Sequence, residues 1–328
     1  MGEIMEKIIY QSNKTTVSYD LTLFILTYKR FDYLSELIDC LKKMIKSKKL
    51  NILVHISDNC STDIPDKLSF CNEKLIDFPF DVLYTYNLNG ENFVDNFNHC
   101  IDLCKSEYMS FCHDDDLLNY NYFVYCEKLL FDMNKKNISY MIPHYKIFKE
   151  NLSENPYFCQ KYKISKYKLK YMYYCRGNCF LAISCGAILK TDDAKSLKGL
   201  DVDKEPASDF DYVVRNLFLG NKVAKCKFIT GYYRMFNNAS SEKKIQYDAR
   251  KCDLNILTKY KNTCLFSKIL MRHFLYEIIL DYSIRFNLDY NLLISNSNYK
   301  LVKAKKVKYI LMKMLCKFLK LLHGIKNN

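Results

Sequence analysis

The chain has 328 residues, of which 49% are hydrophobic and 26% charged, a composition that supports a folded core and excludes a disordered protein. It contains only 8 glycines and neither a G-x-G-x-x-G nor a Walker A sequence, which argues against classical dinucleotide and P-loop chemistry. The net charge is +14, and such a basic chain predicts an anionic partner such as lipid headgroups, nucleic acid or a polyanionic glycan.

The 15 cysteines are spread along the chain without a C-x-x-C pair. This pattern favours buried, reduced thiols over a disulfide framework. The first residues lack the apolar core of a signal peptide, and no run of about 18 uncharged apolar residues indicates a transmembrane helix. We therefore expect a cytoplasmic protein with one large α/β domain and a smaller appendage.

The first predicted elements alternate between strand and helix. After a polar lead-in over residues 1–20, the apolar run Leu21–Tyr28 has the length of a strand covered on both faces. The next predicted elements are a helix over residues 34–45, strands over residues 52–57 and 82–86, and a helix over residues 93–104. Strands and helices at this spacing predict a mainly parallel sheet with right-handed crossovers.

Three consecutive aspartates, Asp114, Asp115 and Asp116, follow the apolar run of residues 108–112, and an amphipathic segment with helical spacing begins at Leu117. Clustered carboxylates repel one another unless a cation or a hydrogen-bond network holds them. Oxygen ligands suit Mg²⁺ or Mn²⁺ better than zinc. The alternative is a solvated loop in which Asp116 caps the next helix.

Polar clusters end three of the predicted strands, at residues 27–30, 58–63 and 113–116. In a parallel sheet these clusters meet at one edge, where open α/β sheets bind ligands. Together they predict a nucleotide-binding crevice. In it, Tyr28 can stack on a base, Asp58 can accept a hydrogen bond from a base N–H, and Arg30 can reach a diphosphate.

Residues 21 to about 240 resemble a family 2 glycosyltransferase of the GT-A fold. The matching motifs are T-Y-K-R at residues 27–30, D-N-C-S-T-D at residues 58–63, and S-E-Y-M-S-F at residues 106–111, just before the acidic triplet. The resemblance implies an α/β, GT-A (Rossmann-like), mainly parallel sheet flanked by helices, with a C-terminal helical extension.

The same resemblance implies roles for individual residues. Thr27, Tyr28, Arg30, Asp58 and Asp114 would bind the donor, with Asp58 on the base and Asp114 near the ribose and the metal. Asp115 would be the principal Mn²⁺ or Mg²⁺ ligand. Many members have an acid where this chain has His113, so Asp116 becomes the candidate for the additional carboxylate. His113 is either a donor contact or a loop histidine without a metal role.

Two later segments also resemble the family. Residues 207–212 are similar to its ED-type segment, in which the aspartate at the helix start is the catalytic base. We assign that role to Asp209, with Asp211 as second choice; capping of the helix is a compatible alternative. Residues 231–240 are similar to a Y-R-x-H segment near the diphosphate, which implies a phosphate contact for Arg234, although Asn237 stands about where the histidine is expected.

The predicted organisation is a lead-in over residues 1–20, a glycosyltransferase domain over residues 21–240 and a helical, basic region over residues 241–328. No acidic residue follows Asp289, and residues 299–322 combine lysines with large apolar side chains. This segment either lies on an anionic membrane, which would place the protein peripherally on its inner face, or docks on the body with its lysines outward.

These inferences combine into one predicted activity. The protein would be an inverting, metal-dependent hexosyl- or N-acetylhexosaminyltransferase that moves a sugar from a nucleotide donor, UDP-linked by preference, to a saccharide or lipid-linked acceptor. The product would be a surface glycan such as a capsule, O-antigen or lipooligosaccharide, and no nucleic-acid partner is expected. One alternative is a sugar-phosphate nucleotidyltransferase, which normally has a glycine-rich first loop. Another is a non-catalytic basic membrane- or RNA-binding protein, which leaves the convergent acids unexplained.

Overall fold

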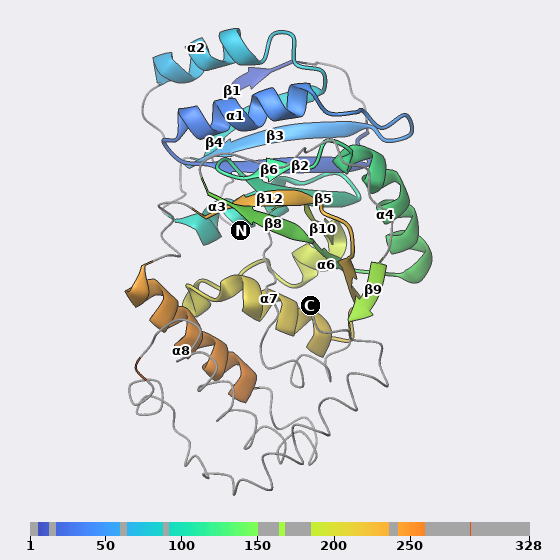
Figure 1. The fold of residues 1–328 in the computed structure, drawn as a ribbon, viewed down its shortest axis with the longest axis vertical. Coiled ribbons are helices and arrows are strands. Elements are labelled where there is room, and N and C mark those ends of the chain that lie inside the picture. The colour runs from blue at the N-terminus through green and yellow to red at the C-terminus, as the bar shows by residue number, and fades with distance from the viewer. Residues whose placement is uncertain are drawn as a thin grey trace, which may run out of the picture. The chain divides into compact units, whose positions relative to one another are not determined.

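The computed structural model describes residues 6–12, 18–59, 64–87, 92–149, 164–167, 185–235, 242–259 and 289 (Figure 1). The chain divides into two compact units. The first comprises residues 1–166, 181–202 and 215–236, and the second comprises residues 167–180, 203–214 and 237–328. The first unit contains the sheet that positions the candidate site.

Four parallel strands form the centre of this unit: β2 (Leu21–Thr27), β3 (Ile52–Asp58), β4 (Asp81–Asn87) and β5 (Tyr108–His113). They lie in the order β4-β3-β2-β5 with parallel pairing throughout. Every residue of β2 is buried, as its continuous apolar sequence predicts for a strand covered on both faces. The predicted α/β class with parallel central strands is confirmed.

Antiparallel and mixed pairings extend the sheet to nine strands in the order β1-β4-β3-β2-β5-β10-β7-β11-β9. The outer strands are β1 (Glu6–Gln11), β7 (Tyr140–Ile142), β9 (Ile164–Tyr167), β10 (Ala187–Lys190) and β11 (Val223–Cys226). Strand β10 pairs antiparallel with both β5 and β7, and β1 pairs antiparallel with β4. Strand β1 lies in the stretch expected to be a polar lead-in.

Helices α1 (Phe31–Lys42), α2 (Ile64–Lys74) and α3 (Phe93–Leu103) connect the central strands, and α4 (Tyr122–Lys136) lies between β6 (Leu117–Leu118) and β7. Helix α1 buries Leu34, Leu37, Ile38 and Leu41, one apolar stripe at helical spacing. The amphipathic segment predicted from Leu117 begins differently, because Leu117–Leu118 form strand β6 and the helix starts only at Tyr122.

A second sheet has three strands, and one of them, β6, follows the acidic triplet directly in the sequence. In it β12 (Gly231–Arg234) pairs antiparallel with β6 and parallel with β8 (Tyr145–Phe148). This pairing brings Arg234 next to the triplet although the two are far apart in the sequence.

The remaining described elements are α6 (Thr191–Ser196), the short 3₁₀ helix η1 (Val202–Lys204), α7 (Ser208–Phe218) and α8 (Lys243–Lys259). Helix α8 falls in the region predicted to be helical and basic, whereas residues 299–322 lie outside the described residues. Within the part of the chain that the structure describes, the cysteines all carry free thiols, and no helix is both long and apolar enough to cross a membrane.

Candidate active site

The polar residues that end β2, β3 and β5 lie side by side. The register places Thr27 opposite Asp58 and Leu26 opposite His113. Beyond the strands, the Asn59 N–H donates to the Thr27 carbonyl at 3.1 Å and the Asp114 N–H donates to the Leu26 carbonyl at 3.1 Å. The structure therefore brings residues 27–30, 58–59 and 113–116 to one edge of the sheet, and the rest of the second predicted cluster, residues 60–63, lies outside the described residues.

The turn after β2 supplies two partners for the acidic triplet. The Thr27 hydroxyl donates to Asp114 Oδ2 at 2.7 Å. Lys29 adopts a left-handed backbone conformation with φ 54°, and the next residue, Arg30, places one guanidinium nitrogen 2.6 Å from Asp114 Oδ1 and the other 2.7 Å from Asp115 Oδ2. Burial raises the pKa of Asp114 to about 6, although Arg30 and the Thr27 hydrogen bond both act to lower it.

Asp116 and Arg234 tie the triplet to the second sheet. Asp116 is fully buried; its carboxylate accepts from the Cys185 thiol at 2.9 Å and from the Arg234 backbone N–H at 3.0 Å. The Arg234 side chain donates from Nε to the Asp115 carbonyl at 2.8 Å and pairs with Glu36 of α1. Strand β12 therefore holds both Asp115 and Asp116 in place.

The Arg234 guanidinium is itself surrounded by aromatic rings. Its central carbon lies 4.5 Å from the centroid of the Phe148 ring and 4.9 Å from that of Tyr33. The Arg234 side chain is only 5% exposed, so it stabilises the acidic turn, residues 114–116, from a buried position. The phosphate contact implied by the family motif remains a prediction.

Three side chains at this edge could hold a metal ion together. His113, Asp115 and Asp116 each offer a ligand atom, and these atoms lie within 4.8 Å of one another. Burial lowers the pKa of His113, which favours the neutral imidazole that can bind a cation. The two carboxylates provide the hard oxygen ligands that Mn²⁺ and Mg²⁺ prefer, so the group fits a divalent cation. His113 is the member to which sequence reasoning assigned no metal role.

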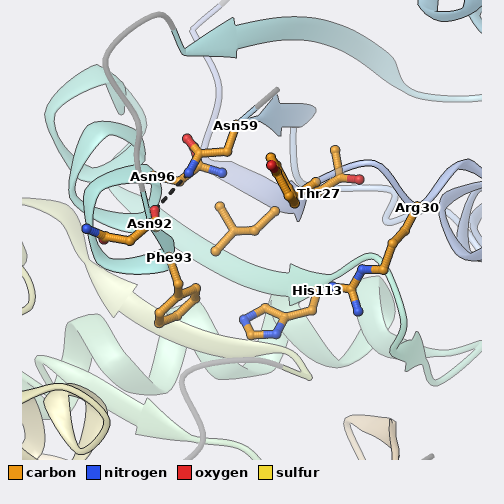
Figure 2. A pocket seen from close by; sticks show the side chains of 9 residues that line it. Thr27, Arg30, Asn59, Asn92, Phe93, Asn96 and His113 are labelled. Carbon is orange, nitrogen blue, oxygen red and sulfur yellow. Dashed lines mark hydrogen bonds between the residues drawn. The ribbon is translucent and has the colours of Figure 1, made fainter. Parts of the chain in front are cut away.

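A cavity of about 260 Å³ opens beside these residues (Figure 2). It is lined by Leu26, Thr27, Tyr28, Arg30, Asn59, Asn92, Phe93, Asn96 and His113. Figure 2 shows the Phe93 and His113 rings next to each other and the three asparagines grouped away from Arg30; the two ring centroids are 5.2 Å apart. Tyr28 is 54% exposed, so its ring is accessible for stacking.

The three asparagines form a fixed polar wall that the sequence analysis did not identify. Asn59 donates its amide to the Asn92 carbonyl at 2.8 Å. Asn92 caps α3 by accepting the Asp95 N–H, and Asn96 exchanges two hydrogen bonds with Ser57 at the end of β3. The position of Asn92 just before an amphipathic helix is a capping signal that could have indicated it. Asn59 belongs to the polar cluster predicted after the second strand, whereas no comparable signal marks Asn96.

Asp58 lies in a buried ionic network behind the cavity. It is 2% exposed, and its carboxylate accepts from the Tyr84 hydroxyl at 2.9 Å and pairs with the Lys67 ammonium at 3.2 Å. Lys67 comes from α2 and its side chain is only 1% exposed; a lysine buried this deeply needs such a counter-ion. No sequence motif indicated Lys67. The role of Asp58 in binding a base remains a prediction.

Both predicted catalytic aspartates lie in the first turn of α7, in the second compact unit. Asp209 is half-buried and accepts the Phe210 N–H at 2.7 Å, and burial raises its pKa to about 6, partly opposed by that hydrogen bond and by Arg250. Asp211 is buried. A carboxyl group with a pKa near neutrality is suited to accept a proton from a hydroxyl group.

An α/β sheet with a group that could hold a cation and a cavity at the carboxyl ends of its parallel strands is compatible with nucleotide-dependent transfer. The model of glycosyl transferase family 2 matches residues 22–197, which is more than half of the chain. The chain belongs to this family and is a glycosyltransferase. No curated protein sequence matches it.

Several solved structures share the fold. The crystal structure of Staphylococcus aureus TarS residues 1–349 in complex with UDP has a TM-score of 0.53 and 15% identity, and the match covers 81% of this chain and 72% of that one. The complex of TarS 1–349 with UDP-GlcNAc has a TM-score of 0.52 and 14% identity, and the match covers 94% of this chain and 93% of that one. The mannosyltransferase PcManGT from Pyrobaculum calidifontis, in complex with GDP-Man and Mn²⁺, has a TM-score of 0.53 and 12% identity, and the match covers 95% of this chain and 89% of that one. At these identities the likeness shows the fold alone, and it confirms the predicted GT-A class.

Proposed function

We propose that the protein is an inverting, metal-dependent glycosyltransferase that takes a sugar from a UDP-linked donor and transfers it to a saccharide or lipid-linked saccharide acceptor during the building of a surface glycan. The observation that carries the proposal is the meeting of Arg30, the acidic triplet and the cavity at one edge of the sheet. Similar folds bind UDP, UDP-GlcNAc and GDP-Man, which supports a nucleotide-sugar donor.

The donor would lie in the cavity with its diphosphate toward the acidic turn. Tyr28 offers an exposed ring for stacking on the base. Asn59 and Asn92 offer amide groups, and Asp58, oriented by Lys67 and Tyr84, would accept from a base N–H. Arg30 stands between the cavity and the aspartates, where its fork of N–H groups can bind phosphate oxygens.

His113, Asp115 and Asp116 would hold the divalent cation. When bound, Mn²⁺ or Mg²⁺ neutralises the charge that develops on the departing diphosphate. The protein's own contribution is to fix the ligands. Arg234 holds the Asp115 carbonyl and the Asp116 carboxylate, and the Cys185 thiol donates to the other Asp116 oxygen.

Asp209 would act as the general base, with Asp211 as second choice. It would remove the proton from the acceptor hydroxyl while that oxygen bonds to the anomeric carbon on the face opposite the leaving diphosphate, which inverts the configuration. The hydrogen bond from Phe210 fixes the direction of the Asp209 carboxylate.

The proposal is tested by measuring nucleoside diphosphate release from UDP-, GDP- and dTDP-sugars with Mn²⁺, with Mg²⁺ and with EDTA. Asp115→Asn is the test variant. Asp39→Asn is the matched control, because Asp39 is half-exposed on α1 and pairs only with Lys74 among the interactions described. We expect metal-dependent release from a UDP-sugar that falls by at least about 100-fold in Asp115→Asn and is unchanged in Asp39→Asn.

If no donor is hydrolysed, calorimetric titration with UDP and Mn²⁺ separates two cases. Binding of both ligands indicates an enzyme that requires its acceptor for turnover. Absence of binding of any nucleoside diphosphate would refute the proposal.

A further inference from the structure

Arg30 forms ion pairs with two residues of the acidic turn, Asp114 and Asp115. Its two terminal nitrogens lie 2.6 Å from Asp114 Oδ1 and 2.7 Å from Asp115 Oδ2. The side chains of the two aspartates are 0% and 9% exposed, whereas that of Arg30 is 41% exposed. The single positive charge of Arg30 therefore reduces the repulsion between two carboxylates, but it offsets only one of their two negative charges if both are ionised.

The same Asp115 carboxylate belongs to the group that could hold a divalent cation. A guanidinium group and a divalent cation on one carboxylate repel each other strongly over a few ångströms. Asp116 accepts hydrogen bonds from the Cys185 thiol and the Arg234 backbone N–H, whereas Asp115 is the carboxylate of the group that the Arg30 guanidinium contacts. Asp115 is thus the member of the group for which Arg30 and a metal ion compete.

The surroundings of Arg30 allow it to exchange partners. Its backbone carbonyl accepts the Leu34 N–H at 3.0 Å, which holds the start of α1, while its side chain makes no capping hydrogen bond to that helix. The guanidinium also lines the cavity. It can therefore turn from the aspartates toward an anion in the cavity without unwinding α1.

We propose that Arg30 is a positioning residue that competes with the divalent cation for Asp115 and yields when a diphosphate arrives. This inference rests on the proposed function, because it assigns the cavity to a nucleotide diphosphate. In the absence of nucleotide, Arg30 weakens metal binding. A diphosphate offers Arg30 a bidentate anionic partner and so releases Asp115 to the metal. Arg30 thereby contributes to a positive coupling between metal and diphosphate binding, which acts equally in both directions.

The test measures the affinity of the full chain for Mn²⁺. The chain is titrated with Mn²⁺, once without nucleotide and once with saturating UDP, and the free ion is monitored by its electron paramagnetic resonance signal. The variants are Arg30→Gln and Arg30→Lys. The matched control is Lys29→Gln, which removes the same charge one residue away from a side chain whose described contact is with the Tyr28 ring.

Without nucleotide, we expect Arg30→Gln to bind Mn²⁺ about 5- to 10-fold more tightly than wild type. Arg30→Lys should bind it more tightly by a smaller factor, since one ammonium group cannot span both carboxylates as the guanidinium fork does. Lys29→Gln should change the affinity less than about 2-fold. Saturating UDP should strengthen Mn²⁺ binding by a larger factor in wild type than in Arg30→Gln.

Each other result has a definite meaning. If wild type and Arg30→Gln bind Mn²⁺ equally well without nucleotide, the proposed competition is overturned. It is also overturned if Lys29→Gln gains as much Mn²⁺ affinity as Arg30→Gln. In either case, UDP-dependent Mn²⁺ binding by wild type would leave the proposed function intact. Arg30→Lys carries the same test if Arg30→Gln does not fold. Failure of the wild type to bind Mn²⁺ with or without UDP would overturn the proposed function and the competition together.

Discussion

At the scale of single residues, three adjacent aspartates have three different environments. Asp114 contacts the Thr27 hydroxyl and Arg30, Asp115 also pairs with Arg30, and Asp116 accepts hydrogen bonds from the Cys185 thiol and the Arg234 backbone N–H. Neighbours of different charge give identical side chains different affinities for protons and cations. For this reason the three carboxylates are not equivalent, as the proposed division between donor and metal requires.

Asp209→Asn is expected to lower kcat by about 10²- to 10⁴-fold with little change in donor KM, because the amide cannot take the acceptor proton. In the proposed mechanism the base is the ionised form of Asp209, and burial raises the pKa of this carboxyl group to about 6, so kcat/KM should rise with pH below about 6 and level off above it. Asp203→Asn, which changes an exposed acid of the same compact unit, should keep both activity and pH profile. An unchanged profile in Asp209→Asn would show that another group titrates.

The raised pKa of Asp209 also affects stability. Because burial raises the pKa of Asp209, the protonated carboxyl group stabilises the folded state. This contribution to the free energy of unfolding is fully present below the ordinary pKa of 3.8 and is lost as pH rises through about 6. The Asn variant should lack this loss. Thermal melting between pH 4 and 7 should therefore show a smaller decline in stability for Asp209→Asn than for wild type.

Arg234→Met is expected to lower the free energy of unfolding by about 2 kcal/mol or more, because it leaves the Asp115 carbonyl without its donor and removes a buried charge between two rings. Mn²⁺ affinity should fall as well, since the acidic turn loses its brace. Glu36→Gln should have a smaller effect of below about 1 kcal/mol, because Glu36 is half-exposed. Urea unfolding and Mn²⁺ titration measure the two effects; equal losses in both variants would contradict the role of the buried contacts.

At the scale of elements, the small sheet of β6, β12 and β8 fixes the acidic turn. Strand β6 begins one residue after the triplet, and its pairing with Gly231 and Tyr232 prevents Leu117 and Leu118 from joining the following helix. The first sheet presents the strand ends, while the second holds the triplet against them. Close approach of β12 to β6 is therefore a requirement of the site.

Gly231→Ala tests this requirement. An added Cβ would lie 2.7 Å from the Leu117 carbonyl oxygen and 3.1 Å from that of Cys185, so the two strands must separate, at a cost of about 1–3 kcal/mol. Gly220→Ala is the control, since its Cβ meets nothing within 4 Å and its φ of 82° alone is strained, at a cost of about 1 kcal/mol. Both variants should melt earlier, but only Gly231→Ala should lose Mn²⁺ affinity. Preserved affinity there would mean that the acidic turn does not depend on β12.

At the scale of the whole molecule, charge is distributed unevenly along the chain. The net charge is +14, and eight lysines fall within residues 299–322 without a single acid. Such a segment is expected to bind anionic lipid headgroups, with about 1 kcal/mol for each basic side chain near the surface. Binding at a membrane would bring the enzyme to a lipid-linked acceptor.

The membrane prediction is tested by co-sedimenting the full chain with vesicles of phosphatidylglycerol and phosphatidylcholine. Wild type should bind at low salt and dissociate as salt rises. Replacement of Lys303, Lys305, Lys306 and Lys308 with glutamine should reduce the affinity by at least about 10-fold. The control replaces four exposed lysines of the first unit, Lys43, Lys48, Lys49 and Lys227. An equal loss in the control would assign the binding to net charge rather than to this segment.

Local sequence patterns are sufficient to predict the central strands and the edge at which their polar ends meet. A strand covered on both faces is mostly apolar, so β2, β3 and β5 appear as predominantly apolar runs, interrupted only by small polar residues and His55, that stop at polar clusters. Alternation with helices then predicts parallel order, and parallel order places Thr27, Asp58 and the triplet at one edge. Each of these steps depends on patterns confined to a few neighbouring residues.

The pairing of side chains at that edge, in contrast, depends on the tertiary fold. Arg234 meets Asp116 across 118 residues of sequence, Lys67 reaches Asp58 from a helix, and His113 joins Asp115 and Asp116. Leu117 and Leu118 fit a helical pattern as well as a strand, and pairing with β12 selects the strand. Apolar periodicity reports burial, a local property, whereas these pairings depend on how distant segments pack and leave no local pattern in the sequence.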